Sequence, residues 1–188
     1  MVVRKGAKKN VPNGPTGFGH SFEDHFTTSL EPTADTYHRV IRYRFGYLNL
    51  VIRHEVDAYC DSSDRTLKET FHGIDTPDSP QATIQHPILH SIATPVIPRG
   101  TRIPQYQTAE LKTSSKQGAI RQCWFGRTPN LCIAKHKNGL ITCADMKDIW
   151  GECVEYEKAQ QQNLRRLAGL LGQIREVIKG IGSGRGCL

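Results

Sequence analysis

The chain has 188 residues, of which 37% are hydrophobic and 23% are charged, so it can form one domain with a modest core. No apolar run is long enough to span a bilayer and no secretory signal is visible, so we expect a nuclear or cytoplasmic protein that is not secreted. The formal charge of +7 favours an anionic partner, and nucleic acid is the commonest such partner.

The N-terminal segment is basic and then becomes amphipathic. Residues 1–16 hold four Lys and Arg residues together with Gly and Pro, which predicts a disordered arm that is either solvated or in contact with phosphate. Phe18, Phe22 and Phe26 then recur every four residues, as on one face of a helix. Glu23 flanks this face, either as a charged edge or as a carboxylate delivered to a functional site.

The next segment, residues 36–57, is predicted to form a β-hairpin with its turn near Gly46. Alternation in the second arm places Glu55 and Asp57 on one side of the strand. Neighbouring like charges are unfavourable unless a cation lies between them. The candidates are a divalent metal ion and, as a structural alternative, Arg53.

Residues 60–104 change in character, because six prolines interrupt any periodicity. A structureless run of this length is uncommon inside a compact domain. We therefore expect an insertion, largely a loop, between two strands that are neighbours in the sheet.

A strand is predicted over residues 106–113, with Glu110 and Lys112 on one face and Leu111 on the other. A metal ion held by Glu110 beside the Lys112 ammonium is suited to phosphodiester cleavage, because the metal activates water and the cation stabilises charge on phosphate. The alternative is an ordinary ion pair on an exposed strand.

A helix is expected to begin after this strand and to run to about Phe125, with Gln122 among its polar residues. Gly126 and Pro129 end it. Short strands at 130–135 and 140–146 follow, and the Asn-Gly pair between them predicts a tight hairpin turn.

The C-terminal region, residues 150–179, is predicted to form one long helix or two shorter ones. Its apolar stripe consists of Leu164, Leu167, Leu171, Ile174 and Ile178. The stripe is too short for a convincing coiled coil with a partner, so we expect it to cover the sheet. The predicted fold is α/β (α+β), a mixed sheet flanked by helices within one domain of residues 17–180, followed by a flexible tail at 181–188.

The order of the acidic motifs resembles a known pattern. An Asp on one strand and Glu-x-Lys on the next, here Asp57 and then residues 110–112, is the signature of the PD-(D/E)XK nuclease superfamily. Within it, the chain resembles the eukaryotic decapping exonuclease family, metal-dependent enzymes that hydrolyse incomplete, NAD-type or unmethylated 5′ ends of RNA.

Four short motifs carry this resemblance, which covers about residues 17–178. Residues 19–23 are similar to the family's Gly-aromatic-x-Phe-Glu motif, residues 55–57 to its Glu-hydrophobic-Asp motif, and residues 110–113 to its Glu-Leu-Lys-Thr motif. Gln122 resembles the family's active-site glutamine. The loop between the second and third motifs is longer here, and the family's N-terminal Arg motif has no counterpart, so we expect a relative truncated at the N-terminus.

The residues and the resemblance together imply a metal-dependent phosphodiesterase or pyrophosphohydrolase acting on RNA 5′ ends, of the decapping or 5′–3′ exonuclease type. The expected cofactor is Mg²⁺ or Mn²⁺, as two ions. The expected metal ligands are Glu23, Glu55, Asp57 and Glu110; the catalytic residues are Glu110, Lys112, Asp57 and Gln122; the nucleic-acid contacts are Arg53, Lys116 and Arg121. The alternatives are a truncated, non-catalytic relative that binds RNA or a protein partner, and a DNA nuclease.

Overall fold

The computed structural model describes residues 2–3, 9–10, 18–29, 36–60, 103–113 and 116–181. The strands are β1 (Val2–Val3), β2 (Lys9–Asn10), β3 (Thr27–Thr28), β4 (His38–Phe45), β5 (Leu48–Glu55), β6 (Ala58–Tyr59), β7 (Thr108–Lys112), β8 (Asn130–Lys137) and β9 (Leu140–Asp148). The helices in this part of the chain are α1 (Phe18–Phe26), α3 (Lys116–Gly126), α4 (Trp150–Ala159) and α5 (Gln161–Gly180), with a 3₁₀ turn, η1 (Gln105–Gln107), before β7.

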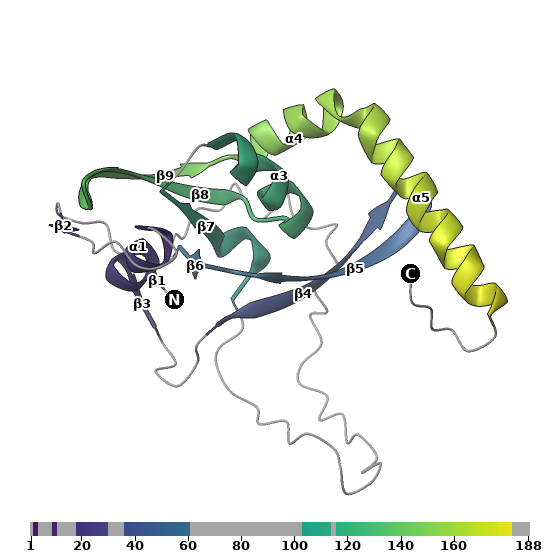
Figure 1. The fold of residues 1–188 in the computed structure, drawn as a ribbon, viewed down its shortest axis with the longest axis horizontal. Helices are drawn as coiled ribbons and strands as arrows, with labels where there is room; N and C mark the ends of the chain where they lie inside the picture. Colours follow the sequence, from purple (N-terminus) through teal and green to yellow (C-terminus); the bar gives the residue numbers. More distant parts are fainter. Residues whose placement is uncertain are drawn as a thin grey trace, which may run out of the picture.

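The main sheet has seven strands in the order β2-β9-β8-β7-β6-β1-β3 (Figure 1). The β7–β8 pair is parallel and the β6–β7 pair is antiparallel, so the predicted mixed sheet with flanking helices is confirmed. Ala58 pairs with Ala109, which confirms that the strands on either side of the insertion are neighbours. Residues 61–102 of that insertion lie outside the described part of the chain. The predicted hairpin turn is confirmed by the positive φ angles of Asn138 (49°) and Gly139 (83°).

Parts of the N-terminal arm differ from the prediction of disorder. Residues 2–3 pair with β3 and β6, and residues 9–10 pair with β9. The physical reason is that sheet edges carry main-chain N–H and C=O groups that remain available for pairing with any extended segment. The other residues of the predicted arm, and those of the tail beyond Ile181, lie outside the described residues.

The hydrophobic core consists of two clusters, one on each side of β7. On one side, Ala109 and Leu111 pack with Phe22 and Phe26 of α1, which confirms the predicted aromatic face of that helix. The other cluster joins α3, α4, α5, β8 and the β4–β5 hairpin; its buried members are Ile41, Tyr43, Phe45, Ala119, Cys123, Trp124, Leu131, Ile149, Cys153, Leu164 and Ala168. Glu110 is therefore set in the protein interior, between elements that exclude water from it.

The β4–β5 hairpin forms a separate two-stranded sheet with an unbroken register from His38↔Glu55 to Phe45↔Leu48. It reaches from the main sheet to α5, which crosses its far end (Figure 1). There the Tyr47 hydroxyl donates a hydrogen bond to the Ala168 carbonyl at 3.1 Å. The C-terminal helix thus does pack on a sheet, and that sheet is the hairpin.

The C-terminal segment is divided into two helices at Gln160, one of the two forms that the sequence allowed. α4 packs against α3, whereas the inward face of α5 lies on the hairpin. None of the helices in the described ranges is both long enough and apolar enough to cross a membrane.

Two glycines of α5 provide a matched test of this packing. A Cβ at Gly172 would overlap the Tyr47 hydroxyl, whereas a Cβ at Gly169 would meet nothing within 4 Å. Gly169→Ala should raise the free energy of unfolding by about 1 kcal/mol, because alanine favours a helix over glycine by that amount. Gly172→Ala should be about 1 to 2 kcal/mol less stable than Gly169→Ala, because Tyr47 must leave its hydrogen bond. Urea unfolding of both variants measures the difference.

The control for this prediction is the same pair of substitutions in a Tyr47→Ala background. Without the tyrosine ring, both glycine substitutions should have the same effect on the free energy of unfolding. If the two substitutions still differed in their effect on the free energy of unfolding in that background, contact between Tyr47 and Gly172 would not be the cause.

Candidate active site

The centre of the candidate site is an ion pair on β7. The Lys112 ammonium contacts Glu110 Oε1, so the two side chains share a face as the alternation predicts. The Glu110 side chain is only 3% exposed and that of Lys112 is 29% exposed. Burying an ion pair is costly, because both charges lose their hydration, and it rarely adds net stability. The pair is therefore not the exposed surface ion pair that was the structural alternative.

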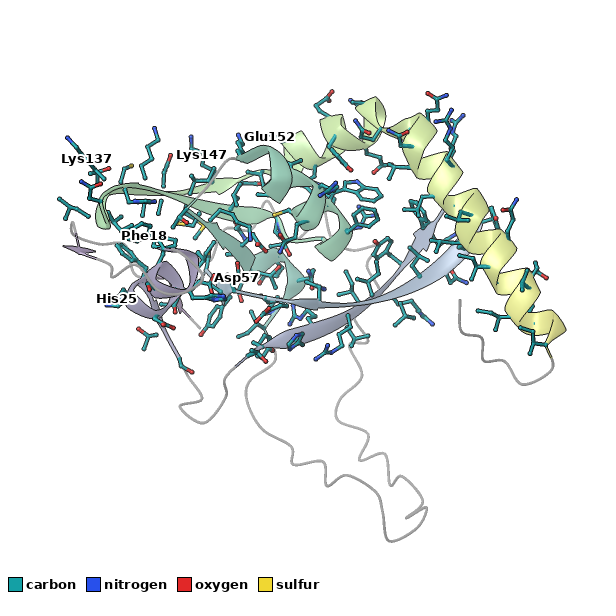
Figure 2. All side chains as sticks on the ribbon, in the orientation of Figure 1. Phe18, His25, Asp57, Lys137, Lys147 and Glu152 are labelled. Carbon is teal, nitrogen blue, oxygen red and sulfur yellow. The ribbon has the colours of Figure 1, made fainter. Side chains whose placement is uncertain are left out.

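A second carboxylate is fixed to this strand from another segment. Asp57 lies between β5 and β6, and its Oδ2 accepts a hydrogen bond from the Leu111 main-chain N–H at 2.9 Å. Figure 2 shows Asp57 beside α1, the helix that carries Glu23. The Glu23 side chain is half-buried and close enough to feel the charge of Asp57. Three segments that are far apart in the sequence thus bring three carboxyl groups and one ammonium together.

The pKa values of the buried carboxyl groups are raised by their surroundings. Burial raises the pKa of Glu110 to about 7; the charge of Asp57 adds to this effect and Lys112 opposes it. Burial also raises the pKa of Asp57, against the opposing effect of the Leu111 N–H. The two carboxyl groups are close enough for their ionised forms to repel one another, which favours protonation of Glu110.

The other two charged groups respond to the same environment. Burial and then the charge of Asp57 raise the pKa of Glu23. Burial by itself would lower the pKa of Lys112, but its contact with Glu110 and the charges of Asp57 and Glu23 raise it above the ordinary value. The site therefore has an excess of negative charge with one cation fixed inside it, which is an environment that attracts a further cation.

The predicted metal ligands are only partly brought together. Among the described residues, no group of three or more His, Cys, Asp or Glu side chains is placed to hold a metal ion. The closest arrangement is the Asp57–Glu110 pair, which offers hard oxygen donors. This donor set fits Mg²⁺, an ion that proteins often hold through one or two carboxylates while it keeps several waters.

Two of the predicted site residues lie apart from this pair. Glu55 is exposed, because β5 ends there and the strand alternation that would align it with Asp57 is lost. Its charge still acts weakly on Asp57 and Glu23. Gln122 is exposed on α3, whereas its neighbour Cys123 is buried and close enough to feel the charge of Glu110. Neither residue is placed by the structure in contact with the Asp57–Glu110 pair.

The predicted nucleic-acid contacts are at the surface. Arg53 is exposed on β5 and Arg121 is exposed on α3. Lys116, at the beginning of α3, forms an ion pair of 2.6 Å with Glu152 of α4. Their role in binding nucleic acid stays a prediction.

The sequence analysis missed Arg127, which comes directly after α3. Its φ angle is 51°, a left-handed conformation that usually belongs to glycine at the end of a helix. The Thr128 N–H donates to the Cys123 carbonyl at 2.9 Å. This hydrogen bond, which spans more residues than those within the helix, is typical of such a helix end. The helix was predicted to end at Gly126, and no local sequence signal marked Arg127 as a functional residue.

Comparison with known proteins gives the family of this chain. A family model with the description "Domain of unknown function (DUF8563)" matches residues 3–188. The chain belongs to this DUF8563 family. No curated protein matches the chain. Among solved structures, the crystal structure of Scheffersomyces stipitis Rai1 in complex with (3'-NADP)+ and calcium ion is similar, with a TM-score of 0.41 and 15% sequence identity. The match covers 69% of the DUF8563 chain and 30% of the Rai1 chain.

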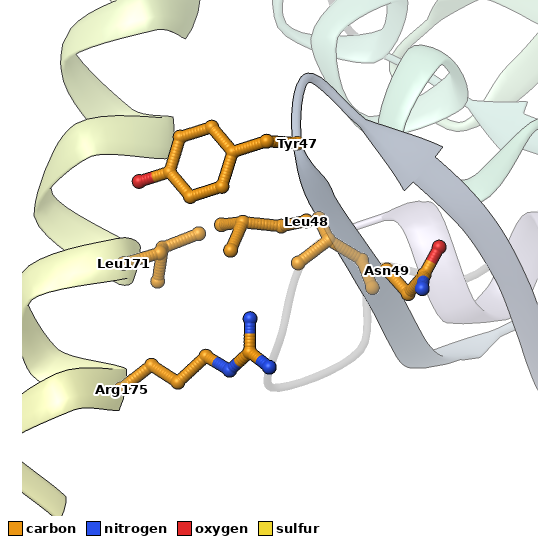
Figure 3. Close-up of a pocket in the computed structure, with 6 residues that line it drawn as sticks. Tyr47, Leu48, Asn49, Leu171 and Arg175 are labelled. Carbon is orange, nitrogen blue, oxygen red and sulfur yellow. The ribbon is translucent and has the colours of Figure 1, made fainter.

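The DUF8563 chain also has a cavity of about 490 Å³ that lies elsewhere, between the β4–β5 turn and α5 (Figure 3). Tyr47, Leu48 and Asn49 line it from the hairpin, and Leu171 and Arg175 line it from the helix. None of the site carboxylates lines it, so it is not part of the candidate active site.

The raised pKa of Glu110 predicts how the stability of the metal-free DUF8563 chain depends on pH. The folded chain holds this proton up to about pH 7, whereas the unfolded chain releases it near pH 4.5. Stability should therefore fall as pH rises between these values, by on the order of 3 kcal/mol from this residue. Glu110→Gln should remove most of this fall, as measured by urea unfolding at pH 5, 6.5 and 8 in the presence of a chelator.

The matched control is Glu152→Gln, which removes an exposed carboxylate and leaves Glu110 in place. This variant should keep the pH dependence of the wild type. An identical pH dependence in wild type and Glu110→Gln would contradict the raised pKa of Glu110.

Proposed function

We propose that this chain is a metal-dependent phosphodiesterase that acts on RNA, with Asp57, Glu110 and Lys112 at its reaction centre. The observation that carries the proposal is the buried Glu110, held between a carboxyl group and an ammonium. Such an arrangement lowers stability when no cation is bound, since the carboxyl groups lose hydration and repel each other. Strongly shifted carboxyl groups beside a fixed cation are typical of catalytic sites.

Asp57 and Glu110 would hold the metal ion, Mg²⁺ or Mn²⁺, and Glu23 would add negative potential nearby. When bound, such an ion supplies a more acidic water and offsets negative charge on phosphate. In its most detailed form, the proposal has two metal ions and four carboxylate ligands.

Lys112 would stabilise charge on the substrate phosphate. Its ammonium contacts Glu110 on one side while the side chain remains 29% exposed, so it can reach a substrate phosphate. Its raised pKa keeps it protonated at neutral pH, and a fixed positive charge stabilises the negative charge that develops on a phosphate oxygen during cleavage. The hydrogen bond from Leu111 keeps Asp57 oriented next to this pair.

The proposed substrate is RNA, and its 5′ end in particular. The net charge of +7 supports a nucleic acid, and the four motifs that resemble the decapping exonucleases support RNA and 5′-end chemistry. We infer removal of a modified 5′ end or 5′–3′ cleavage. The alternative is a non-catalytic relative that binds RNA or a protein partner, which the exposure of Glu55 and Gln122 favours.

Cleavage assays test directly whether the chain is a metal-dependent nuclease. Wild type with Mn²⁺ or Mg²⁺ should cleave 5′-modified single-stranded RNA, and a matched DNA strand in parallel distinguishes an RNA nuclease from a DNA nuclease. Glu110→Ala should abolish cleavage, and Lys112→Ala should lower kcat by about 10² to 10³, the loss typical of removing one group that stabilises the transition state. Glu155→Ala, which removes an exposed carboxylate paired with Lys158, is the control and should keep full activity. Unchanged cleavage by Glu110→Ala would overturn the proposal.

Metal binding separates the enzyme from its non-catalytic alternative. Because Glu110 has a pKa of about 7, Mn²⁺ binding at pH 7 should release about half a proton from it, and affinity should rise from pH 6 to pH 8. Calorimetric titrations in two buffers with different ionisation enthalpies measure the released protons. No binding at millimolar Mn²⁺ would favour the non-catalytic relative.

A further inference from the structure

A cavity of about 290 Å³ lies where the β4–β5 turn, the end of α3, and the helices α4 and α5 meet. Its lining is unusually rich in arginine. The residues that matter here are Arg44, Phe45, Trp124, Arg127, Glu157 and Arg165, and we name this cavity the Arg127 pocket. None of the carboxylates of the candidate active site lines it.

The charges of the Arg127 pocket are unbalanced. Three guanidinium groups line it, and within the described part of the chain none of them forms a hydrogen bond or an ion pair. The single acidic residue, Glu157, is already occupied, because its Oε2 accepts a hydrogen bond from Trp124 Nε1 at 3.0 Å. The pocket therefore carries an excess of two positive charges and has many free N–H donors.

Arg127 itself is fixed by three aromatic rings. Its guanidinium carbon lies 4.3 Å from the ring centre of Tyr43, 4.6 Å from that of Trp124 and 5.9 Å from that of Trp150. Stacking on rings holds the planar guanidinium in one orientation, so little entropy is lost when it binds an oxyanion. Burial lowers the pKa of Arg127, and the charge of Glu157 opposes this effect.

The backbone of Arg127 gives an independent reason to assign it a role. A φ angle of 51° is unfavourable for a residue with a side chain, and glycine is the usual choice at this place in a helix end. Strained residues of this kind cluster at ligand sites. An arginine at this position therefore points to a function for its side chain, since glycine would close the helix equally well.

We propose that the Arg127 pocket binds a phosphate group, with Arg127 as the fixed donor and with Arg44 and Arg165 as exposed partners. Several guanidinium groups suit a tetrahedral phosphate better than a single planar carboxylate, because its oxygens accept from several directions at once. The rings of Phe45 and Trp124 are buried, so they are not available to stack on a base. The pocket thus recognises phosphate without reading a base.

The phosphate has two possible sources, a free phosphate or nucleotide and the backbone of an RNA strand. Lys112 of the active site precedes α3 in the chain, and Arg127 of the pocket follows it. Burial raises the pKa of Cys123, in the second half of α3, and the charge of Glu110 adds to this effect, so the active site lies close to this helix. An RNA strand that contacted both sites would therefore pass beside α3. This second source rests on the proposed function, whereas the phosphate site itself does not.

Phosphate binding to the pocket can be followed by tryptophan fluorescence. The chain has two tryptophans, Trp124 and Trp150, and both rings are in contact range of the Arg127 guanidinium. Tryptophan emission excited at 295 nm is followed on the full chain, without metal, during titration with inorganic phosphate, a mononucleotide or single-stranded RNA. At least one of these probes should give a saturable change.

The variants identify the residues that bind. Arg127→Lys keeps the charge and removes the planar fork, and Arg127→Gly relieves the backbone and removes the charge. Each should weaken binding by at least tenfold, as should Arg165→Ala. Arg166→Ala is the matched control, because Arg166 is the next residue of α5, carries the same charge and does not line the pocket. It should bind as tightly as wild type. Circular dichroism confirms that each variant is folded.

The outcomes distinguish the sources and separate this inference from the proposed function. Saturation by phosphate or mononucleotide supports a free ligand. Saturation by RNA alone supports a strand if the slope of log affinity against log salt concentration becomes shallower by about 0.7 in Arg127→Gly, which loses one charge, and stays unchanged in Arg127→Lys. No change with any probe, or equal affinities for wild type and both Arg127 variants, would overturn the pocket. If RNA binds through Arg127 and is still not cleaved after Mn²⁺ or Mg²⁺ is added, the proposed function is contradicted and the pocket is supported.

Discussion

The hydrogen bond from the Leu111 N–H to Asp57 is the contact on which the candidate site depends. It joins residues 54 positions apart and fixes the segment after the hairpin to β7. Asp57 is thereby held close to Glu110, and the Lys112 ammonium contacts the same Glu110 carboxylate. The main-chain donor is available because β7 is short and its neighbour β6 pairs with it only through Ala58 and Tyr59. A longer ladder at this point would have used the same N–H group for strand pairing.

The α3 helix lies close to two sites of opposite charge. Near its residue Cys123 lie the buried carboxyl groups, whose raised pKa values arise from lost hydration and mutual repulsion. Beyond its end lie the three arginines of the Arg127 pocket. The first site gains stability when it takes up a cation and the second when it takes up an anion. A phosphate ester with its associated metal ion brings both kinds of charge, which is the physical link between the two proposals.

The β4–β5 hairpin positions parts of both sites. At its base, the segment that follows β5 carries Asp57. Further along, the Tyr43 hydroxyl donates to the Phe125 carbonyl at 3.1 Å, which ties the hairpin to the last turn of α3, and the Tyr43 ring stacks on Arg127. At its far end, Tyr47 packs on α5. The hairpin is separate from the main sheet, so these contacts with α3 and α5 determine its orientation.

The sequence by itself determined the local geometry: the shared face of Glu110 and Lys112, the aromatic face of α1, the hairpin and the Asn138-Gly139 turn. These follow from periods of two and 3.6 residues and from turn chemistry, which depend on neighbours in the chain. Only the tertiary structure decided that Glu110 is buried, that Asp57 turns inward while Glu55 stays exposed, that Gln122 faces solvent and that Arg127 is stacked on rings. Burial, pKa and ring contacts arise between segments far apart in the sequence, and local periodicity carries no information about which segments will meet.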